Sequence, residues 1–416
     1  MSKQLYIYFD DQYGNQASLI GILTAETVRG HEVFSMELTD EWLHDSRCRM
    51  LDPDLQLYRG HQYLPEQKSN FGFLLDSSPD RWGRVLLERR ESLRAKEEQR
   101  TRKTLMESDF LMGVNDESRM GALRIKNTPD GDFIDNDHTS HIPPITSIGD
   151  LEKACWEIEN DEDTANRWLQ MLVIPGSSLG GARPKANIRM TDGRLWIAKF
   201  PSRQDRYDVG AWEAVTMTLA QRFGITVAPF SVQRFHNRYH TFLTRRFDRN
   251  AAGQRIHFTS AMTMLGYRDG DSDGCSYLEL AEWITRHCQC VNDNLLQLWK
   301  RIAFNIAVSN CDDHLRNHGF LLGRNGWMLS PAYDLNPIPH GQGLSLNINE
   351  QDNSLDLRLA MDIAPYFGLS PQQAKSELEQ LGAVVGHWEQ EATRLHISRE
   401  QQELMRHAFS AGVGGL

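Results

Sequence analysis

Asn310-Cys-Asp-Asp-His-Leu-Arg-Asn-His-Gly-Phe320 is followed, after a short connection, by Leu329-Ser-Pro-Ala-Tyr-Asp-Leu-Asn-Pro337. Four residues separate Asp312 from Asn317, the spacing of the protein-kinase catalytic loop, in which the aspartate accepts the substrate hydroxyl proton and the asparagine holds magnesium. Asp334 is then a second magnesium ligand, because Mg²⁺ prefers hard oxygen ligands from one or two carboxylates together with nucleotide phosphates. The spacing predicts a phosphoryl-transfer centre.

A capped, solvated helix end is the alternative for this stretch, because Asp and Asn also favour caps and turns. Two neighbouring segments favour the catalytic interpretation. An apolar run with helical period, from Leu295 to Ala307, places the acidic loop at the end of a buried helix. Residues 319–329 then form a predicted hairpin that turns at Asn325-Gly326 and returns Asp334 toward Asn317.

Length and composition indicate a soluble globular protein. The chain has 416 residues, enough for two or three domains, with 40% hydrophobic and 24% charged residues. We expect a cytoplasmic protein without a membrane partner, because the sequence lacks an apolar run of about 18 residues and a basic-then-apolar signal region at its start. The net charge of −11 argues against broad contact with nucleic-acid phosphates.

The cysteines give little evidence for a metal site or for disulfides. There are six, they are scattered, and they lack paired zinc spacing, so we expect reduced thiols. Cys288 and Cys290 beside His287 are only a weak metal signal.

A second informative stretch, Gly176-Ser-Ser-Leu-Gly-Gly-Ala-Arg-Pro-Lys-Ala-Asn-Ile188, leads into a predicted strand pair. Its glycines allow backbone N–H groups to approach phosphate oxygens, although a flexible surface turn is the alternative for the loop alone. Lys199 favours the phosphate loop, since kinases place a strand lysine on the α and β phosphates, and Lys185 adds a second charge. Glu213, in the first turn of a predicted helix over 209–223, either pairs with Lys199 or is simply a favourable charge near a helix N-terminus.

These patterns predict an α+β, bilobal, protein-kinase-like fold with a β-rich N-terminal lobe and a mostly α-helical C-terminal lobe. Residues 1–126 form an N-terminal subdomain with a small antiparallel β-sheet and helices, and 127–147, rich in Asp, Thr, Pro and Gly, form a linker. Residues 148–248 complete the N-terminal lobe, and 249–416 form the helical catalytic lobe.

Three local predictions belong to this architecture. Ser78 caps a basic helix with Pro79 at its first position. Residues 225–248 form a hairpin whose end marks the connection between the lobes, and hence the adenine pocket. Leu344 to Asn349 form a short strand.

Six motifs occur in order along the chain: Phe73-Leu-Leu-Asp-Ser-Ser-Pro-Asp-Arg-Trp-Gly83, Ser178-Leu-Gly-Gly-Ala-Arg-Pro-Lys185, Ile197-Ala-Lys-Phe-Pro201, Arg246-Phe-Asp-Arg249, Asp312-Asp-His-Leu-Arg-Asn-His-Gly-Phe320 and Pro331-Ala-Tyr-Asp-Leu335. Each motif is weak alone, but in this order they are specific. Over nearly its whole length the chain resembles the HipA family of bacterial serine/threonine kinases, the toxin half of type II toxin–antitoxin modules.

The resemblance implies roles for individual residues. Asp312 is the implied catalytic base, Asn317 and Asp334 are the implied Mg²⁺ ligands, and Lys199 is the implied phosphate-binding lysine. The other implied nucleotide contacts are Gly180, Gly181, Ala182, Arg183, Pro184 and Lys185 in the phosphate loop, Arg245, Arg246 and Phe247 at the adenine hinge, and His314, Arg316, Asn317, Tyr333 and Asp334 in the catalytic segment.

The resemblance also implies self-inhibition. The family phosphorylates a serine just ahead of the glycine loop, which ejects the loop; Ser178 matches that position and Ser177 is adjacent, although a turn-forming serine is the alternative. The chain departs from the best-known members at Arg183-Pro184, where they carry Gln-Glu, and at Arg245, where an acidic residue is common. These departures concern loop ejection and adenine contacts, and leave the metal-binding set unchanged.

The expected activity is ATP- and Mg²⁺-dependent phosphorylation of a serine or threonine of a protein. The resemblance suggests a target in translation, such as an aminoacyl-tRNA synthetase, and a separately encoded HipB-like helix-turn-helix antitoxin through which DNA is contacted indirectly. The alternatives are a small-molecule kinase of the same fold, a metal-dependent nuclease or phosphodiesterase, and a nucleotide-binding protein without turnover.

Overall fold

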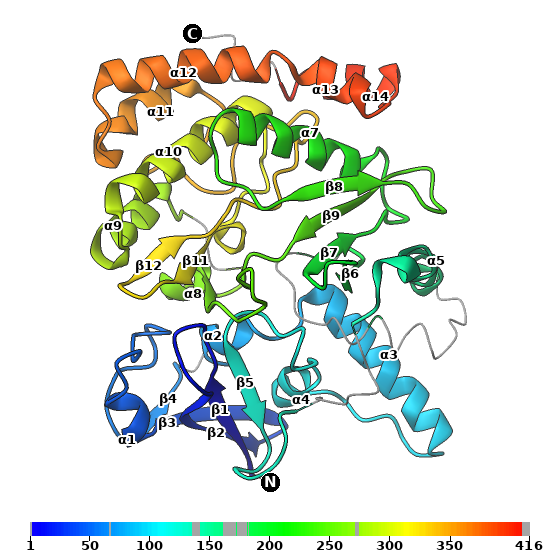
Figure 1. Cartoon of the computed structure of the whole chain (residues 1–416), viewed down its shortest axis with the longest axis vertical. Helices are drawn as coiled ribbons and strands as arrows, with labels where there is room; N and C mark the ends of the chain where they lie inside the picture. Colours follow the sequence, from blue (N-terminus) through cyan, green and yellow to red (C-terminus); the bar gives the residue numbers. More distant parts are fainter. Residues whose placement is uncertain are drawn as a thin grey trace. The chain divides into compact units, whose positions relative to one another are not determined.

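The computed structural model describes residues 2–65, 68–134, 142–160, 172, 181, 183–270 and 274–409 (Figure 1). The chain divides into two compact units. Unit 1 comprises Met1–Arg203 and Arg245–Arg268, and unit 2 comprises Gln204–Thr244 and Asp269–Leu416. The segment 148–248 is thus divided between the units, and the domain boundaries at 126, 147 and 248 remain predictions from sequence.

The first part of unit 1 is an antiparallel sheet with strand order β4-β3-β2-β1-β5 (Figure 1). The strands are β1 Ser2–Phe9, β2 Ser18–Val28, β3 His31–Leu38, β4 His61–Tyr63 and β5 Leu123–Lys126. Alternate side chains of β1, Leu5, Ile7 and Phe9, are buried, as a strand with one face on a core requires. The small N-terminal sheet expected from sequence is confirmed.

Unit 1 also contains short helices and one long helix. They are α1 Asp40–Leu43, α2 Gly72–Leu75, α3 Arg81–Glu97, α4 Glu107–Met112, the 3-10 turn η1 Ile145–Ser147, α5 Ile148–Glu159 and α8 Ala261–Met264, with the short strand β10 Phe258–Ser260 before α8. The N-cap of α3 is Asp80, whose carboxylate accepts a hydrogen bond from the backbone N–H of Gly83 at 2.8 Å. The predicted Ser78 cap is wrong, because the buried Ser78 hydroxyl donates to the Leu74 carbonyl at 2.8 Å and so closes α2 instead.

The glycine-rich stretch leads into a hairpin of β6 Lys185–Arg189 and β7 Leu195–Lys199. The strands are antiparallel, with Lys185 opposite Lys199, and the turn between them uses Gly193 at φ +81°. Directly opposite residues place their side chains on the same face. The first residue of β6 and the last of β7 therefore put two ammonium groups on one face of the hairpin.

Unit 2 is mostly helical. Its elements are α7 Val209–Arg222, β8 Phe230–Gln233, β9 Thr241–Arg245, whose last residue begins the second segment of unit 1, α9 Tyr277–His287, α10 Val291–Val308, η2 Leu315–Asn317, β11 Gly319–Leu322, β12 Trp327–Leu329, α11 Leu357–Ile363, η3 Ala364–Phe367, α12 Pro371–Val385, α13 Trp388–Arg394 and α14 Arg399–Met405. In Figure 1, α12, α13 and α14 follow one another along one side of unit 2, and α10 packs against α12. The predicted helix start at the proline of α12 is confirmed, with Ser370 as its cap.

Helix α10 forms the centre of unit 2 and determines where the catalytic segment begins. Leu298, Trp299 and Ile302 are fully buried, and each such side chain contributes about 1.5–3 kcal/mol on leaving water. The helix ends at Ser309, which has a left-handed backbone conformation (φ +51°) and turns the chain into the acidic loop.

The hairpin predicted after the acidic loop is present. Strands β11 and β12 pair antiparallel, and Gly326 lies in the turn at φ +151°, which an L side chain rarely adopts. The strand predicted over Leu344–Asn349 is wrong. Leu344, Leu346 and Ile348 are buried on one side, which explains the alternation. The backbone, however, makes only isolated bridges, including one between Asn347 and Ser276, and bonds to the nearby turn residues Asn353 and Asp352.

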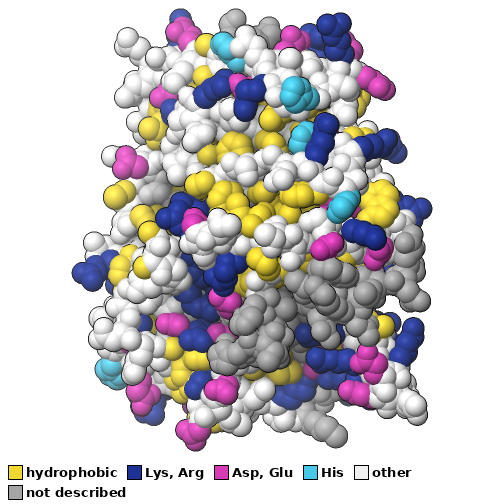
Figure 2. Space-filling model, turned by 45° about the vertical axis from the view of Figure 1, so that its right-hand side comes forward, with side chains coloured by type: hydrophobic (Ala, Val, Ile, Leu, Met, Phe, Trp, Pro, Cys, Tyr) yellow, Lys and Arg dark blue, Asp and Glu magenta, His cyan; other side chains and the backbone are white. Residues whose placement is uncertain are grey.

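Basic and acidic side chains are interspersed among uncharged ones on the face that Figure 2 shows. Within the described residues, no helix is both long enough and apolar enough to cross a membrane.

Candidate active site

The loop after α10 is organised around Asp313, the second aspartate of the pair. Its Oδ2 accepts hydrogen bonds from the Tyr277 hydroxyl at 2.5 Å and the Asn305 side-chain amide at 2.7 Å, and lies 2.8 Å from Nε2 of His318. Burial opposes ionisation of Asp313, but His318 and the hydrogen bonds outweigh it and lower the pKa of this carboxyl. Asp313 is therefore a structural hub inside unit 2.

Sequence reasoning missed this hub. The hydrogen-bonding partners of Asp313 come from α9, α10 and the segment before β11, up to 36 residues away, so no local spacing relates them. An extended carboxamide chain continues from the hub: Asn310 donates to Asn305 at 3.0 Å and accepts from the backbone of Asn336 at 3.1 Å. The hub thus fixes the start of the catalytic segment and its later part relative to α10.

Asp312, the residue before Asp313, is on the surface, whereas Asp313 is buried. The Asp312 side chain makes none of the hydrogen bonds that hold Asp313. Partial desolvation raises the pKa of the Asp312 carboxyl, His314 opposes the rise, and the nearby carboxylates of Asp334 and Asp313 add to it. An accessible carboxylate with a raised pKa is suited to accept a proton.

Asn317 closes the loop onto Asp312. Its side-chain Nδ2 donates to the Asp312 backbone carbonyl at 2.8 Å, so the four-residue spacing seen in the sequence corresponds to a closed loop. Its Oδ1 is buried and has no hydrogen-bond partner within the part of the chain that the structure describes. An unsatisfied buried amide oxygen is costly unless a ligand completes it.

Asp334 lies near this oxygen-rich end and is held in a special conformation. Its φ is +59°, and Nδ2 of Asn336 donates to its Oδ1 at 3.1 Å. Asn336 is a second residue that the sequence analysis missed, two positions beyond the predicted ligand. A carboxylate and an amide oxygen form a hard donor set that fits Mg²⁺.

A protein-only metal site is not found. Among the described residues, no group of three or more His, Cys, Asp or Glu side chains could hold a metal ion.

The remaining predicted contacts of unit 2 have defined positions. The Tyr333 hydroxyl donates to the Arg316 carbonyl at 2.6 Å, and Nε of Arg316 lies 3.5 Å from Asp269. His314 keeps a buried Nδ1 without a hydrogen-bond partner in the described residues. These contacts make Tyr333 and Arg316 a brace across the catalytic segment.

In unit 1, Lys199 is buried at the end of β7, and Lys185 is buried opposite it. Nζ of Lys185 lies 2.7 Å from Oδ2 of Asp80 and donates to the Gly181 carbonyl at 3.2 Å. Pro184 extends the hairpin by accepting from the backbone of Phe200 at 2.9 Å. Lys185 therefore holds the base of the glycine-rich loop instead of being fully available to phosphate.

Some predicted site residues lie outside the described residues, and some predicted contacts join a residue of unit 1 to a residue of unit 2. Ser177, Ser178, Gly180 and Ala182 lie outside the described residues. The pairing of Lys199 with Glu213, and the approach of Lys199 to the oxygen ligands, join unit 1 to unit 2 and stay predictions.

At the predicted hinge, the Arg246 side chain is committed to the fold. It is fully buried, its guanidinium lies 2.6 Å from Asp248, and it donates to Asn187 at 3.1 Å. Its backbone N–H donates to Leu195 at 3.0 Å, and the neighbouring Phe247 ring packs 5.8 Å from Phe258. Arg245 and Phe247 are half-buried, so these two members of the trio keep side-chain surface that can contact a ligand.

Comparison with solved structures identifies the fold. The Shewanella oneidensis toxin–antitoxin complex of HipA, HipB and operator DNA contains a chain that matches with a TM-score of 0.67, covering 99% of this chain and 96% of that one at 19% identity. The fold is therefore the HipA kinase-like α+β fold, as predicted. A family model for the HipA-like C-terminal domain matches residues 177–388, just over half of the sequence, and the chain belongs to the HipA-like family.

Two curated relatives show how far the sequence likeness extends. A protein of Sinorhizobium fredii named "Putative kinase Y4mE" is 29% identical over 182 residues, 38% of this chain and 41% of the relative. The serine/threonine-protein kinase toxin HipA of Shewanella oneidensis is 25% identical over 190 residues, 39% of this chain and 43% of the relative. The matched segments span less than half the length of these two relatives.

Proposed function

We propose that this chain is an ATP- and Mg²⁺-dependent serine/threonine protein kinase that acts as the toxin of a HipBA-like module. The observation that carries the proposal is the combination of the accessible Asp312 carboxylate with the unsatisfied Oδ1 of Asn317. One group accepts a proton and the other is a hard ligand, which are the two functions that phosphoryl transfer requires of a protein.

In this proposal the residues of unit 2 act by position and charge. Asp312 accepts the proton of the substrate hydroxyl, and Asn317 and Asp334 hold Mg²⁺. When bound, the ion neutralises charge on the phosphates of ATP. Asp313 touches none of the reacting groups and orients the loop from beneath.

Unit 1 supplies most of the proposed contacts with the nucleotide, and His314, Arg316 and Tyr333 of unit 2 add others. Lys199 binds the phosphates, and the loop from Gly180 to Lys185 covers them, with Lys185 held by Asp80 at its base. Arg245 and Phe247 contact adenine, while Arg246 contributes structure because its side chain is buried.

The biological partners follow from the family. The solved relative contains HipA, HipB and operator DNA, which supports a HipB-like antitoxin as partner and an indirect contact with DNA. We propose a translation component such as an aminoacyl-tRNA synthetase as the substrate, and self-inhibition by phosphorylation at Ser178 or Ser177.

Incubation of the purified chain with γ-labelled ATP and Mg²⁺, followed by mass spectrometry, tests the activity. Label on Ser177 or Ser178 supports the protein kinase. Label only on an added metabolite would instead favour a small-molecule kinase, and nucleic-acid cleavage without nucleotide would favour a nuclease.

A further inference from the structure

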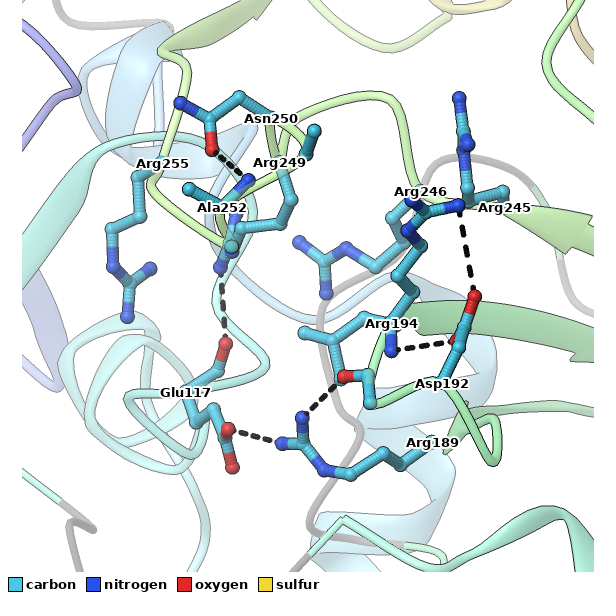
Figure 3. A pocket seen from close by; sticks show the side chains of 14 residues that line it. Glu117, Arg189, Asp192, Arg194, Arg245, Arg246, Arg249, Asn250, Ala252 and Arg255 are labelled. Atoms are coloured by element: carbon cyan, nitrogen blue, oxygen red, sulfur yellow. Dashed lines mark hydrogen bonds and ion pairs between the residues drawn. The ribbon is translucent and has the colours of Figure 1, made fainter.

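Unit 1 contains a cavity of about 330 Å³ that uses none of the oxygen ligands described above (Figure 3). It is bordered by the turn between β6 and β7, the end of β9 and the loop 249–255. Arginines approach it from all three segments: Arg189, Arg194, Arg245, Arg246, Arg249 and Arg255. Two of the lining residues, Arg245 and Arg246, also belong to the predicted adenine hinge, and the other lining residues have no predicted contact with the nucleotide.

The cavity has a surplus of positive charge. Its lining contains six arginines but only two carboxylates, Glu117 and Asp192. Two more carboxylates lie beneath it, and both are shared: Asp248 pairs with Arg246 and Arg249, and Asp116 pairs with Arg124 as well as Arg255. Even when Asp248 and Asp116 are included, the arginines outnumber the carboxylates around the cavity. The chain as a whole has a net charge of −11.

Two of the arginines are available to a ligand. Arg194 has a single loose ion pair, 3.6 Å from Asp192, and its side chain is 47% exposed. The Arg245 side chain makes no hydrogen bond or ion pair within the described residues. In contrast, Arg189 is held by Glu117 and by the carbonyl of Gly193.

Arg249 lies among other cations at the base of the cavity, and burial is the main influence on its charge. Burial lowers the pKa of Arg249 to about 9; Asp248 opposes this shift, and Arg255 and Arg246 add to it. An anion in the cavity reduces this mutual repulsion, because charges there are only partly screened by water.

The lining also indicates the kind of anion. A guanidinium presents a planar fork of N–H donors that matches two oxygens of one phosphate. None of the residues lining the cavity is aromatic, so a base has no ring to stack on. The volume is about ten times the share of one water molecule, which is enough for a group of several heavy atoms.

We propose that this cavity binds a small, phosphate-dense anion of the pyrophosphate class, independently of the phosphoryl-transfer site. Arg194 contacts the anion directly, and Arg245, which also borders the proposed adenine contact, lies beside it. Arg246, Arg249 and Arg255 add positive charge beneath the anion. Glu117 limits the affinity by occupying Arg189.

Calorimetric titration of the full chain with pyrophosphate in EDTA tests the proposal. Arg194→Glu should weaken binding at least about tenfold, because it removes a charge-assisted contact and adds a repulsive charge. Glu117→Gln should strengthen binding several-fold, because it frees Arg189. Arg59→Glu is the matched control: Arg59 is 75% exposed, has one ion pair, with Asp40, and lies outside the cavity, so its variant should bind as the wild type does.

The position of the anion is tested with Lys199→Gln, because Lys199 is the proposed phosphate-binding residue of the phosphoryl-transfer site and lies outside the cavity lining; this variant should leave pyrophosphate affinity unchanged. Loss of binding in that variant would place the anion at the phosphoryl-transfer site and overturn the proposal. No binding by the wild type, equal weakening by Arg194→Glu and Arg59→Glu, or binding of duplex DNA but not pyrophosphate would overturn it as well. Circular dichroism of each variant confirms folding, and Arg194→Lys, which keeps the charge but not the fork, should fall between wild type and Arg194→Glu.

Discussion

Nζ of Lys185 lies 2.7 Å from Oδ2 of Asp80, and the two side chains are only 5% and 9% exposed, although their positions differ by 105 in the sequence. Nε1 of Trp82 adds a hydrogen bond to the Lys185 carbonyl at 3.1 Å. The Ser-Ser-Pro-Asp-Arg-Trp motif and the glycine-rich motif are therefore two halves of one structure. This contact explains why a motif far from the catalytic loop accompanies the phosphate-loop motif in the same chain.

Breaking this pair should destabilise the protein. Asp80→Asn keeps an N-cap residue for α3 but leaves the Lys185 ammonium buried without its carboxylate, which costs about 3–5 kcal/mol. Urea denaturation measures the loss. The double variant Asp80→Asn/Lys185→Met should recover much of it, and a loss below about 1 kcal/mol in the single variant would show that the pair is not important for stability.

The two adjacent aspartates should behave in opposite ways on substitution. Asp313→Ala removes the acceptor for three buried groups and should cost about 3–5 kcal/mol. Asp312→Ala, at an exposed position, should change the free energy of unfolding by no more than about 0.5 kcal/mol. Thermal or urea denaturation of both variants makes the comparison, and equal losses would contradict the assignment of Asp313 as the hub.

The free energy of unfolding should fall in mild acid because His257 is buried. It is 1% exposed beside Phe9, and burial lowers its pKa to about 3 from an ordinary value near 6.5. The unfolded chain binds the proton first, so the contribution is complete above pH 6.5 and is lost as the pH falls toward 3. Between pH 7.5 and pH 5 this one residue should account for a loss of about 2 kcal/mol.

Urea denaturation at the two pH values measures that loss. His257→Gln cannot titrate, so its stability should depend less on pH in this interval by a similar amount. An identical pH dependence in wild type and variant would exclude His257 as the cause.

The proposed metal ligands predict a change in magnesium dependence. Asp334→Asn weakens one of the two proposed protein ligands. It should raise the Mg²⁺ concentration for half-maximal phosphoryl transfer by at least about tenfold, because substitution of residues that only hydrogen-bond to metal ligands already lowers metal affinity by about 10–100-fold. Asn336→Ala, which removes a hydrogen bond to Asp334, should have a smaller effect in the same direction. Unchanged magnesium dependence in Asp334→Asn would exclude it as a ligand.

Local signals in the sequence predicted the elements whose interactions are local. The hairpin at Gly326 and the closed loop from Asp312 to Asn317 depend on residues close in the chain, and both are present. The hub at Asp313 and the pair of Lys185 with Asp80 depend on residues brought together only by packing, so no spacing could reveal them.

The two wrong predictions of local structure, the Ser78 cap and the strand over 344–349, also arose because a local pattern does not reveal the hydrogen-bond partners. Serine is a common N-cap residue, but the Ser78 hydroxyl donates to the Leu74 carbonyl at the end of α2. The N-cap of α3 is therefore Asp80. Leu344 to Asn349 alternate because one side is buried, although their backbone forms only isolated bridges, such as that of Asn347 with Ser276, and no strand. Burial pattern alone does not specify a hydrogen-bond partner.

Single-turnover phosphoryl transfer by Asp312→Asn, measured with labelled ATP and saturating Mg²⁺, tests the central claim most directly. The account predicts that the variant folds, binds ATP with an affinity within about threefold of the wild type, and transfers phosphate about 10²–10⁴-fold more slowly, because it lacks the general base. Transfer by Asp312→Asn at a rate within about threefold of the wild type would contradict the account.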